Sequence, residues 1–145
     1  MTYQVTRIPG DGRLEDAFEI RREVFVDEQD VDEDIEYDGR DEESIHFVIT
    51  DTETDTPAGT ARLWTTGDGT GKPERVAVRE PYRGEGLGRR LMELIESEAR
   101  NQDCHRTRLH AQTHVTGFYR DLGYEVTSDE FEEAGIPHVE MEKEL

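Results

Sequence analysis

Three glycines alternate along one short stretch of this chain, and arginines stand on both sides of them. The stretch comprises Arg83, Gly84, Gly86, Gly88, Arg89 and Arg90. Because glycine has no Cβ atom, a ligand can approach the backbone N–H groups of such a stretch closely. Where a helix begins, its first N–H groups have no acceptor within the helix, and they and the helix dipole favour a bound anion. The stretch therefore predicts a site for a phosphate or pyrophosphate group.

The segments on either side of the glycines predict the elements that would form this site. Residues 75–78 are apolar and β-branched after a polar start, which is typical of a buried strand. Residues 87–100 carry apolar side chains at helical spacing and charged side chains on the other side, as an amphipathic helix does. The glycines thus lie where a strand turns into a helix.

Two common phosphate-binding motifs are absent from the chain. No G-x-x-x-x-G-K-[ST] sequence is present, which argues against a P-loop nucleotide hydrolase. The glycines run G-x-G-x-G instead of G-x-G-x-x-G. No acidic residue ends a second strand about twenty residues further on, as a dinucleotide-binding fold requires. The ligand is therefore expected to belong to another class of phosphate compound.

The chain is strongly acidic. Of its 145 residues, 36 are Asp or Glu and 17 are Lys or Arg, so the net charge is −19. Such a surface suits a protein that works in concentrated salt, where screening reduces the repulsion, and we expect a halophilic source. The negative field argues against nucleic acid or an anionic membrane as a partner.

Length and cysteine content bound the class of protein. The length favours a single domain over residues 1–145. Cys104 is the single cysteine, so an intrachain disulfide is excluded and a cytoplasmic location is expected. No apolar run approaches the length of a membrane span, and the N-terminus shows no signal-peptide pattern.

The rest of the chain predicts an alternation of strands and helices. Further strands are expected over residues 3–8, 44–50, 59–65, 107–111, 124–127 and 139–142, and further helices over residues 14–26 and 115–122. Residues 51–57 are predicted as a hairpin connection because they are polar and contain Pro57. Residues 27–43 are dense in acid and are predicted as a loop, with a disordered insert as the alternative.

The spacing Arg83-x-x-Gly86-x-Gly88 after an apolar strand resembles the acyl-CoA pyrophosphate loop of the GCN5-related N-acetyltransferases (GNAT). Three more motifs look like the ElaA/YjcF-like branch of that superfamily. They are F-x-I-R-x-x-V-F-V-x-E-Q at residues 18–29, A-Q-x-x-x-x-F-Y-x-x-x-G-Y at residues 111–124 and E-A-G-I-P-H at residues 133–138. The resemblance covers nearly the whole chain. It implies an α/β (α+β) fold with a mixed, mostly antiparallel central sheet flanked by helices.

The resemblance also implies which residues hold acetyl-CoA, the expected cosubstrate. The backbone of the strand would bind the pantetheine arm, with one N–H near Val78 facing the thioester oxygen, and the glycine loop would bind the pyrophosphate. The residues implied are Val76, Ala77, Val78, Arg83, Gly84, Glu85, Gly86, Leu87, Gly88 and Arg89. Tyr119 lies where related enzymes place a tyrosine hydroxyl beside the CoA sulfur, so it is the candidate general acid; packing of its helix on the sheet is the alternative.

The acceptor side is less defined. The resemblance places Glu28 and Gln29 near the acceptor, with Glu28 as an ammonium binder or base, and Gln112 and His138 are candidate acceptor-binding groups. His46, His114 and His138 are further candidates for the base. A structural role is favoured for His46, and a turn-locking role for His138 competes with acceptor binding. The spacing of Cys104, His105, His110 and His114 matches no zinc motif, so no metal is predicted.

The sequence thus predicts an acetyl-CoA-dependent N-acetyltransferase that acts on a primary amine of a small-molecule or peptidyl acceptor. Two alternatives remain open, a non-catalytic acyl-CoA-binding or sensing module and an acyltransferase that uses a different acyl-CoA. A homodimer is compatible with this fold.

Overall fold

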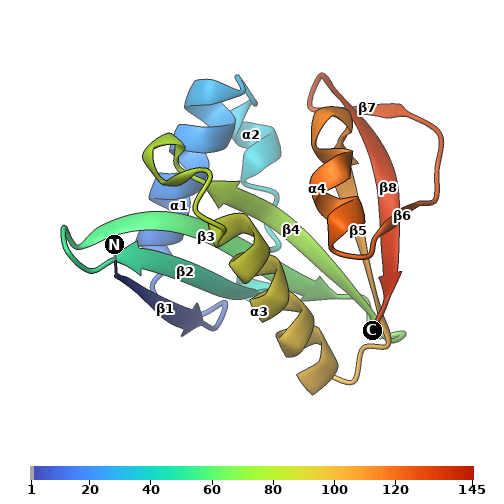
Figure 1. The fold of residues 1–145 in the computed structure, drawn as a ribbon, viewed down its shortest axis with the longest axis horizontal. Helices are drawn as coiled ribbons and strands as arrows, with labels where there is room; N and C mark the ends of the chain where they lie inside the picture. Colours follow the sequence, from blue (N-terminus) through green and yellow to red (C-terminus); the bar gives the residue numbers. More distant parts are fainter. Residues whose placement is uncertain (1) are drawn as a thin grey trace.

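The computed structural model describes residues 2–145, and one mixed sheet of eight strands runs through it (Figure 1). The strands follow the order β1 (Tyr3–Ile8), β2 (Ile45–Asp51), β3 (Thr56–Thr65), β4 (Thr70–Val78), β5 (Arg106–Gln112), β8 (Ile136–Glu144) and β6 (Glu125–Val126), and β7 (Phe131–Glu133) pairs with β8. Every strand pair is antiparallel except β4 with β5. The predicted fold class is confirmed.

Helices cover both faces of this sheet. On one face lie α3 (Leu87–Asn101) and α4 (Thr116–Asp121), and on the other lies α1 (Glu15–Arg21), which continues as the π-helix η1 (Arg22–Glu28). The structure also contains the short helical turns α2 (Glu33–Glu36), η2 (Asp41–Glu43), η3 (Glu80–Tyr82) and η4 (Thr113–Val115). Leu91 and Ile95 of α3 pack into the core of one face, and Ile20 and Val24 pack against Ala77 on the other. Within residues 2–145, no helix is long and apolar enough to cross a membrane.

The one parallel strand pair is very short. β4 pairs with β5 only at Thr70 with Arg106 and at Gly71 with Thr107. Beyond these positions the two strands diverge, as the ribbon in Figure 1 shows. Val76, at the far end of β4, contacts side chains of two separate core clusters. Within residues 2–145, the rest of the β4 edge that faces β5 therefore has no strand paired with it.

β4 also bends at a bulge. Arg75 has a left-handed backbone with φ of 54°, and the register between β3 and β4 shifts between Thr60 and Arg62. An extra residue of this kind bends a strand and increases its local twist. The bulge lies directly before Val76, so it sets the direction of the part of β4 that diverges from β5.

The acidic segment 27–43 is ordered, and buried ion pairs hold it. Arg21 pairs with Glu36 and Asp41, each at 2.7 Å, and Arg62 pairs with Asp41 at 2.9 Å and with Asp38 at 2.6 Å. Both arginine side chains are almost completely buried. The alternative of a disordered insert is therefore wrong, because the acids that made the segment look unstructured are partners of buried arginines.

Several predicted boundaries differ from the structure. β4 begins at Thr70, and Pro57 lies inside β3. Pro57 pairs with Thr50 close to a register shift in the β2–β3 ladder, which is where a strand tolerates a proline. The hairpin of β7 and β8 was missed, because its turn at Ala134 and Gly135 resembles an irregular loop in sequence.

Candidate functional site

The glycine loop has the conformation that glycine allows. Gly84 and Gly86 have φ of 82° and 81°, and a Cβ atom added at either would meet no atom within 4 Å. Space is therefore open on their outer side, while a side chain at these positions would strain the backbone. Arg83 begins this loop and Leu87 begins α3.

The start of α3 is left uncapped. No side chain caps it and its first turn carries no acidic residue, whereas the first turns of α1 and α2 are acidic. In a chain with 36 acidic residues, this helix start combines N–H groups that no side chain caps with a nearby arginine, Arg89. The arrangement favours an anionic ligand.

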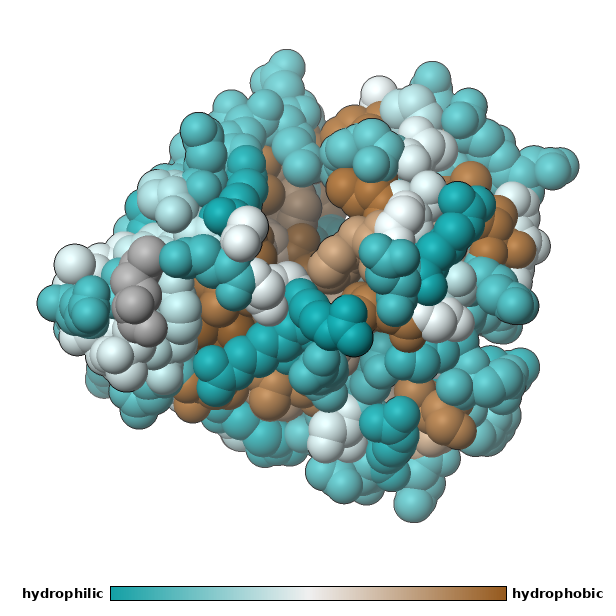
Figure 2. Space-filling model, viewed as in Figure 1, coloured by the Kyte–Doolittle hydropathy of each residue, from teal (hydrophilic) through white to brown (hydrophobic). Residues whose placement is uncertain are grey.

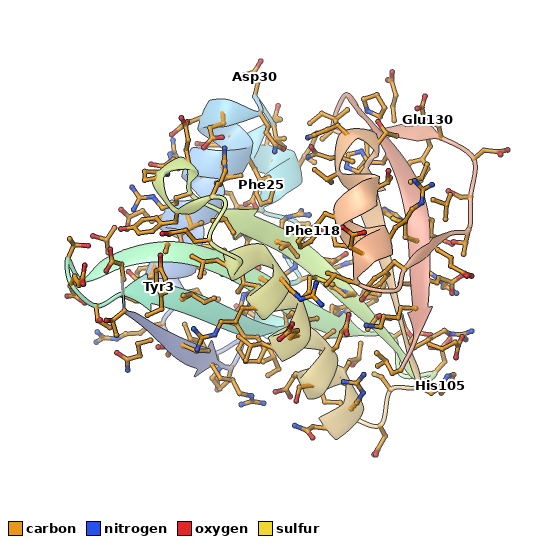
Figure 3. All side chains as sticks on the ribbon, in the orientation of Figure 1. Tyr3, Phe25, Asp30, His105, Phe118 and Glu130 are labelled. Atoms are coloured by element: carbon orange, nitrogen blue, oxygen red, sulfur yellow. The ribbon has the colours of Figure 1, made fainter. Side chains whose placement is uncertain are left out.

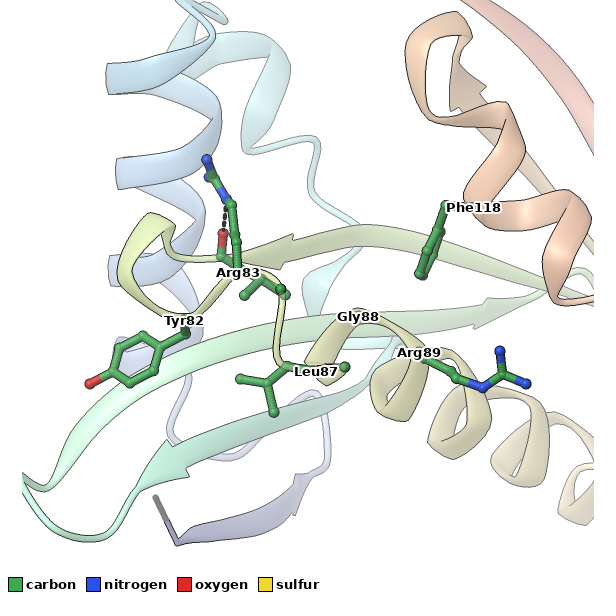
Figure 4. Close-up of a pocket in the computed structure, with 9 residues that line it drawn as sticks. Tyr82, Arg83, Leu87, Gly88, Arg89 and Phe118 are labelled. Atoms are coloured by element: carbon green, nitrogen blue, oxygen red, sulfur yellow. Dashed lines mark hydrogen bonds between the residues drawn. The ribbon is translucent and has the colours of Figure 1, made fainter.

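A cavity of about 400 Å³ opens at this helix start (Figure 4). It is lined by Val78, Tyr82, Arg83, Gly84, Gly86, Leu87, Gly88, Arg89 and Phe118. Seven of the predicted acetyl-CoA residues thus come together, while Val76, Ala77 and Glu85 lie outside the lining. Glu85 accepts a hydrogen bond from the Tyr3 hydroxyl instead. Figure 2 shows the same face of the molecule hollowed, with hydrophobic residues in the hollow.

Two lining residues, Tyr82 and Phe118 of α4, were not predicted as part of the cofactor site. A Cβ atom on Gly88 would lie 3.3 Å from the Phe118 ring, so Gly88 admits this ring to the loop. The F-Y pair of residues 118 and 119 carried the signal, but only the tertiary structure brings α4 against the start of α3.

Arg83 joins the loop to the end of η1. Its Nε donates to the carbonyl oxygen of Val78 at 2.9 Å, and its terminal nitrogen donates to the Glu28 carboxylate at 2.8 and 3.1 Å. Glu28 is the last residue of η1. The predicted base is therefore ion-paired with the predicted pyrophosphate arginine in the structure without ligand.

Tyr119 is packed by aromatic rings, and its hydroxyl is unbound. Its ring meets the Phe118 and Tyr124 rings edge to face at centroid distances of 5.0 and 5.8 Å. Within residues 2–145 the Tyr119 hydroxyl makes no hydrogen bond. Burial raises the pKa of Tyr119 to about 12, so the hydroxyl keeps its proton at neutral pH. A partly buried aromatic ring with an unpaired hydroxyl can donate that proton to a ligand.

The predicted acceptor residues Gln29, Gln112 and His138 come together at the far end of β5. The Gln112 amide donates to the Gln29 side-chain oxygen at 2.8 Å, across the gap between β5 and η1. Gln112 pairs with His138 in the β5–β8 register. His138 Nδ1 lies 2.7 Å from the carbonyl oxygen of Ile136, which fixes the orientation of its ring.

The other histidines that were considered lie elsewhere. His46 is buried, its Nε2 lies 2.9 Å from the Asp41 carbonyl oxygen, and burial lowers its pKa, which is typical of a neutral structural histidine. His114 is exposed on η4. In residues 2–145 no group of three or more potential metal ligands is present.

A family model describes most of this chain. Residues 13–145 match the model of the acetyltransferase (GNAT) domain. The chain belongs to the GNAT acetyltransferase family. The uncharacterized N-acetyltransferase YjcF of Bacillus subtilis is 42% identical over 91% of this chain and 93% of its own. The family and the ElaA/YjcF-like resemblance predicted from the sequence are thus confirmed.

Solved structures show the same fold for this GNAT protein. The crystal structure of Escherichia coli ElaA covers 99% of this chain and 100% of its own with a TM-score of 0.87 and 26% identity. A GNAT acetyltransferase from Elizabethkingia anophelis with acetyl-CoA bound covers 99% and 98% with a TM-score of 0.75 and 14% identity. The second likeness shows the fold alone.

Proposed function

We propose that this GNAT protein transfers an acetyl group from acetyl-CoA to a primary amine of a small-molecule or peptidyl acceptor. One observation carries the proposal: the unpaired edge of β4 leads directly into an uncapped, glycine-rich helix start with a cavity beside it. The edge can bind an extended amide-containing arm, and the helix start can bind its phosphates. The Elizabethkingia relative holds acetyl-CoA on the same fold, which supports this choice of ligand.

In this proposal the chain binds the cosubstrate largely through its backbone. The β4 edge at Val76, Ala77 and Val78 bonds the pantetheine arm as an added strand would, with the N–H near Val78 toward the thioester oxygen. The N–H groups of residues 84–88 receive the pyrophosphate, and Arg83 and Arg89 add positive charge.

The reaction needs few protein groups, because a thioester is already activated. A neutral amine attacks the thioester carbonyl carbon to form a C–N bond, the C–S bond breaks, the nitrogen loses one proton to solvent, and the leaving thiolate takes one. Tyr119 is the proposed donor of that proton, since its hydroxyl is free and protonated at neutral pH. An acceptor that is an ammonium ion at neutral pH must first lose a proton to become this neutral amine.

Binding of the cosubstrate tests this function first. We expect calorimetric titration with acetyl-CoA and with desulfo-CoA in molar KCl to give dissociation constants near micromolar, about −8 kcal/mol. Arg83→Ala removes a charge-assisted hydrogen bond of about 1.5–3 kcal/mol and should weaken binding roughly 10- to 100-fold. Arg100→Ala, an exposed arginine in the last turn of the same helix, is the matched control and should change nothing.

The outcomes separate the alternatives. Acetyl-CoA binding followed by amine-dependent release of thiol supports the transferase. Binding with no thiol release from any amine in a broad screen supports the sensing module. Tighter binding of a longer acyl-CoA supports a different acyl group. Absence of binding to the folded protein contradicts the proposal.

A further inference from the structure

A carboxylate lies between two histidines beside the predicted acceptor residues. The Glu133 Oε1 atom on β7 lies 2.9 Å from His110 Nδ1 on β5, and its Oε2 atom lies 3.6 Å from His138 Nε2 on β8. Glu133 and His110 took no part in the predicted site. Strand β5 and the β7–β8 hairpin, which follows it about twenty residues later, supply this cluster.

The β7–β8 hairpin places Glu133 there. Its turn consists of Ala134 and Gly135, both with positive φ, 53° and 76°, which is the two-residue turn that suits the twist of a hairpin. The same pairing sets Phe131 opposite His138. The Phe131 ring stacks on His138 and meets His110 edge to face at 5.0 Å, so it restricts both imidazoles.

His110 has the geometry of a positioned base. Because Nδ1 lies at hydrogen-bond distance from a carboxylate, Nδ1 carries the proton and Nε2 keeps its lone pair. The His110 side chain is 35% exposed, so Nε2 can be reached by a ligand or a water. His138 differs, since its Nδ1 is bound to the Ile136 carbonyl and its Nε2 lies beyond hydrogen-bond distance of Glu133.

His110 faces the acceptor side of the sheet. Its strand neighbours Leu109 and Ala111 pack beneath α4 in the core, and side chains alternate along a strand. His110 therefore shares the opposite face with Gln112, two residues further on, and Gln112 bonds Gln29 of the segment after η1. The imidazole lies along the same strand face as the groups predicted to bind the acceptor.

Four charged or titratable groups face the His110 ring. Glu133 is negatively charged and accepts a hydrogen bond from His110, and this contact is the main cause of a raised pKa for His110. Glu140, the β8 residue paired with His110, acts in the same direction, and Lys72 of β4 acts against it. His138 lies beyond Glu133. The net effect is a pKa of His110 above its ordinary value.

We propose that His110, positioned by Glu133, accepts the proton of the acceptor ammonium through Nε2, directly or through one water. The N–H bond of the ammonium breaks, its electron pair stays on the amine nitrogen, and His110 becomes the imidazolium stabilised by Glu133. The proton leaves to solvent after acetyl transfer. The proposal rests on the proposed function, and it names an acceptor that is cationic at neutral pH.

Two amines of different basicity test this role. Butylamine is protonated at neutral pH and needs the base, whereas 2,2,2-trifluoroethylamine is largely neutral and does not. We expect His110→Gln to lower kcat/KM for butylamine about 10²- to 10⁴-fold, the usual contribution of a general base. The same variant should change kcat/KM for trifluoroethylamine by no more than about threefold and should leave acetyl-CoA affinity unchanged. His105→Gln is the matched control and should change neither: His105, labelled in Figure 3, directly precedes β5, at the end of that strand away from Gln112.

A second measurement tests the positioning of His110 by Glu133. NMR titration of the imidazoles in the folded protein should show the His110 pKa lower in Glu133→Gln than in the parent, and the acidic limb of the pH profile should move to lower pH with it. An unchanged His110 pKa in Glu133→Gln overturns the positioning role. An equal loss of kcat/KM with both amines in His110→Gln, or no loss with butylamine, overturns the assignment of His110 as the base. If acetyl-CoA binds and neither amine nor any other is acetylated, the proposed transferase itself fails.

Discussion

Two tyrosines of the same core cluster differ in what their hydroxyls touch. The Tyr124 hydroxyl lies 2.7 Å from the Thr107 hydroxyl and 3.0 Å from the Glu96 carboxylate. The Tyr119 hydroxyl, five residues earlier in sequence, has no hydrogen-bond partner within residues 2–145. Since both rings belong to the same core cluster, the contrast identifies Tyr119 as the tyrosine with a hydroxyl available to a ligand.

Tyr119→Phe tests that assignment. We expect kcat to fall by about 10²-fold, because proton donation to the leaving thiolate is lost, and acetyl-CoA affinity to stay within about twofold. The readouts are thiol release at saturating substrate and calorimetry. Tyr124→Phe is the matched control: it breaks buried hydrogen bonds, so it should lower the free energy of unfolding by about 1–3 kcal/mol and leave kcat of the folded protein unchanged. Full turnover of Tyr119→Phe would contradict the general-acid role.

Glu28 competes with the ligand for Arg83. Arg83 and Glu28 form an ion pair at 2.8 Å, with 44% and 31% of their side chains exposed. Exposed pairs of this kind contribute about 0.2–1 kcal/mol. A bound pyrophosphate that uses Arg83 must replace this carboxylate.

Glu28→Gln should therefore strengthen acetyl-CoA binding by up to about fivefold, since Arg83 no longer has to leave a carboxylate. Glu33→Gln, which removes the exposed partner of Arg22, is the control and should not alter affinity. Calorimetry measures acetyl-CoA affinity, and thiol release measures kcat. Unchanged affinity with a large loss of kcat would instead support Glu28 as the base and contradict the assignment to His110.

At the scale of elements, buried charges attach the segment between η1 and β2 to the sheet. Arg62 is completely buried in β3 and reaches Asp38, Asp41 and Glu74. Burial would raise the pKa of Asp38, but the hydrogen bonds and charge of Arg62 outweigh it and lower the pKa to about 2. The segment forms one wall beside the bulged end of β4, so these ion pairs stabilise the acceptor side as well as the fold.

Arg62→Met should be strongly destabilising, because it leaves three carboxylates without their buried partner. We expect the free energy of unfolding to fall by about 3–5 kcal/mol, measured by urea denaturation. Arg108→Met, which breaks a partly exposed pair with Glu142, is the control and should cost less than about 1 kcal/mol. A loss for Arg62→Met no larger than for the control would show that these ion pairs do not hold the segment.

At the scale of the whole molecule, charge is unevenly placed. The net charge is −19; three arginines border the glycine loop, two are buried in the ion-pair network, and Lys72 and Lys143 are the only lysines. Most acids are therefore left without a close cation on the surface. Their mutual repulsion destabilises the compact state at low ionic strength.

The melting temperature should therefore rise by several degrees between 0.1 M and 2 M KCl. The Debye length falls from about 10 Å at 0.1 M to about 3 Å at 1 M, which screens surface repulsion, while buried ion pairs are screened much less. Differential scanning calorimetry measures the shift. Neutral sucrose of equal osmolality is the control for effects that do not depend on charge. A constant or falling melting temperature in KCl would contradict the expected adaptation to salt.

Local sequence patterns predicted the parts of the fold that neighbouring residues determine. The apolar periodicity of α3, the first strand and the strand-to-helix glycine loop were all predicted close to their observed bounds. The loop depends on φ values that glycine adopts at residues 84 and 86, and this is a property of the chain itself. The family resemblance rested on the same local motifs.

Only the tertiary structure decided which distant residues meet. Four features each involve segments that are far apart in sequence. They are the divergence of β4 from β5, the ordered structure of residues 27–43, the contact of Phe118 with Gly88 and the Glu133–His110 contact. Such contacts depend on strand register and on the partners that buried charges find, and neither leaves a periodic pattern along the chain. The glycine loop proposed to bind phosphate could thus be found in the sequence, whereas the base proposed for the acceptor could be found only in the fold.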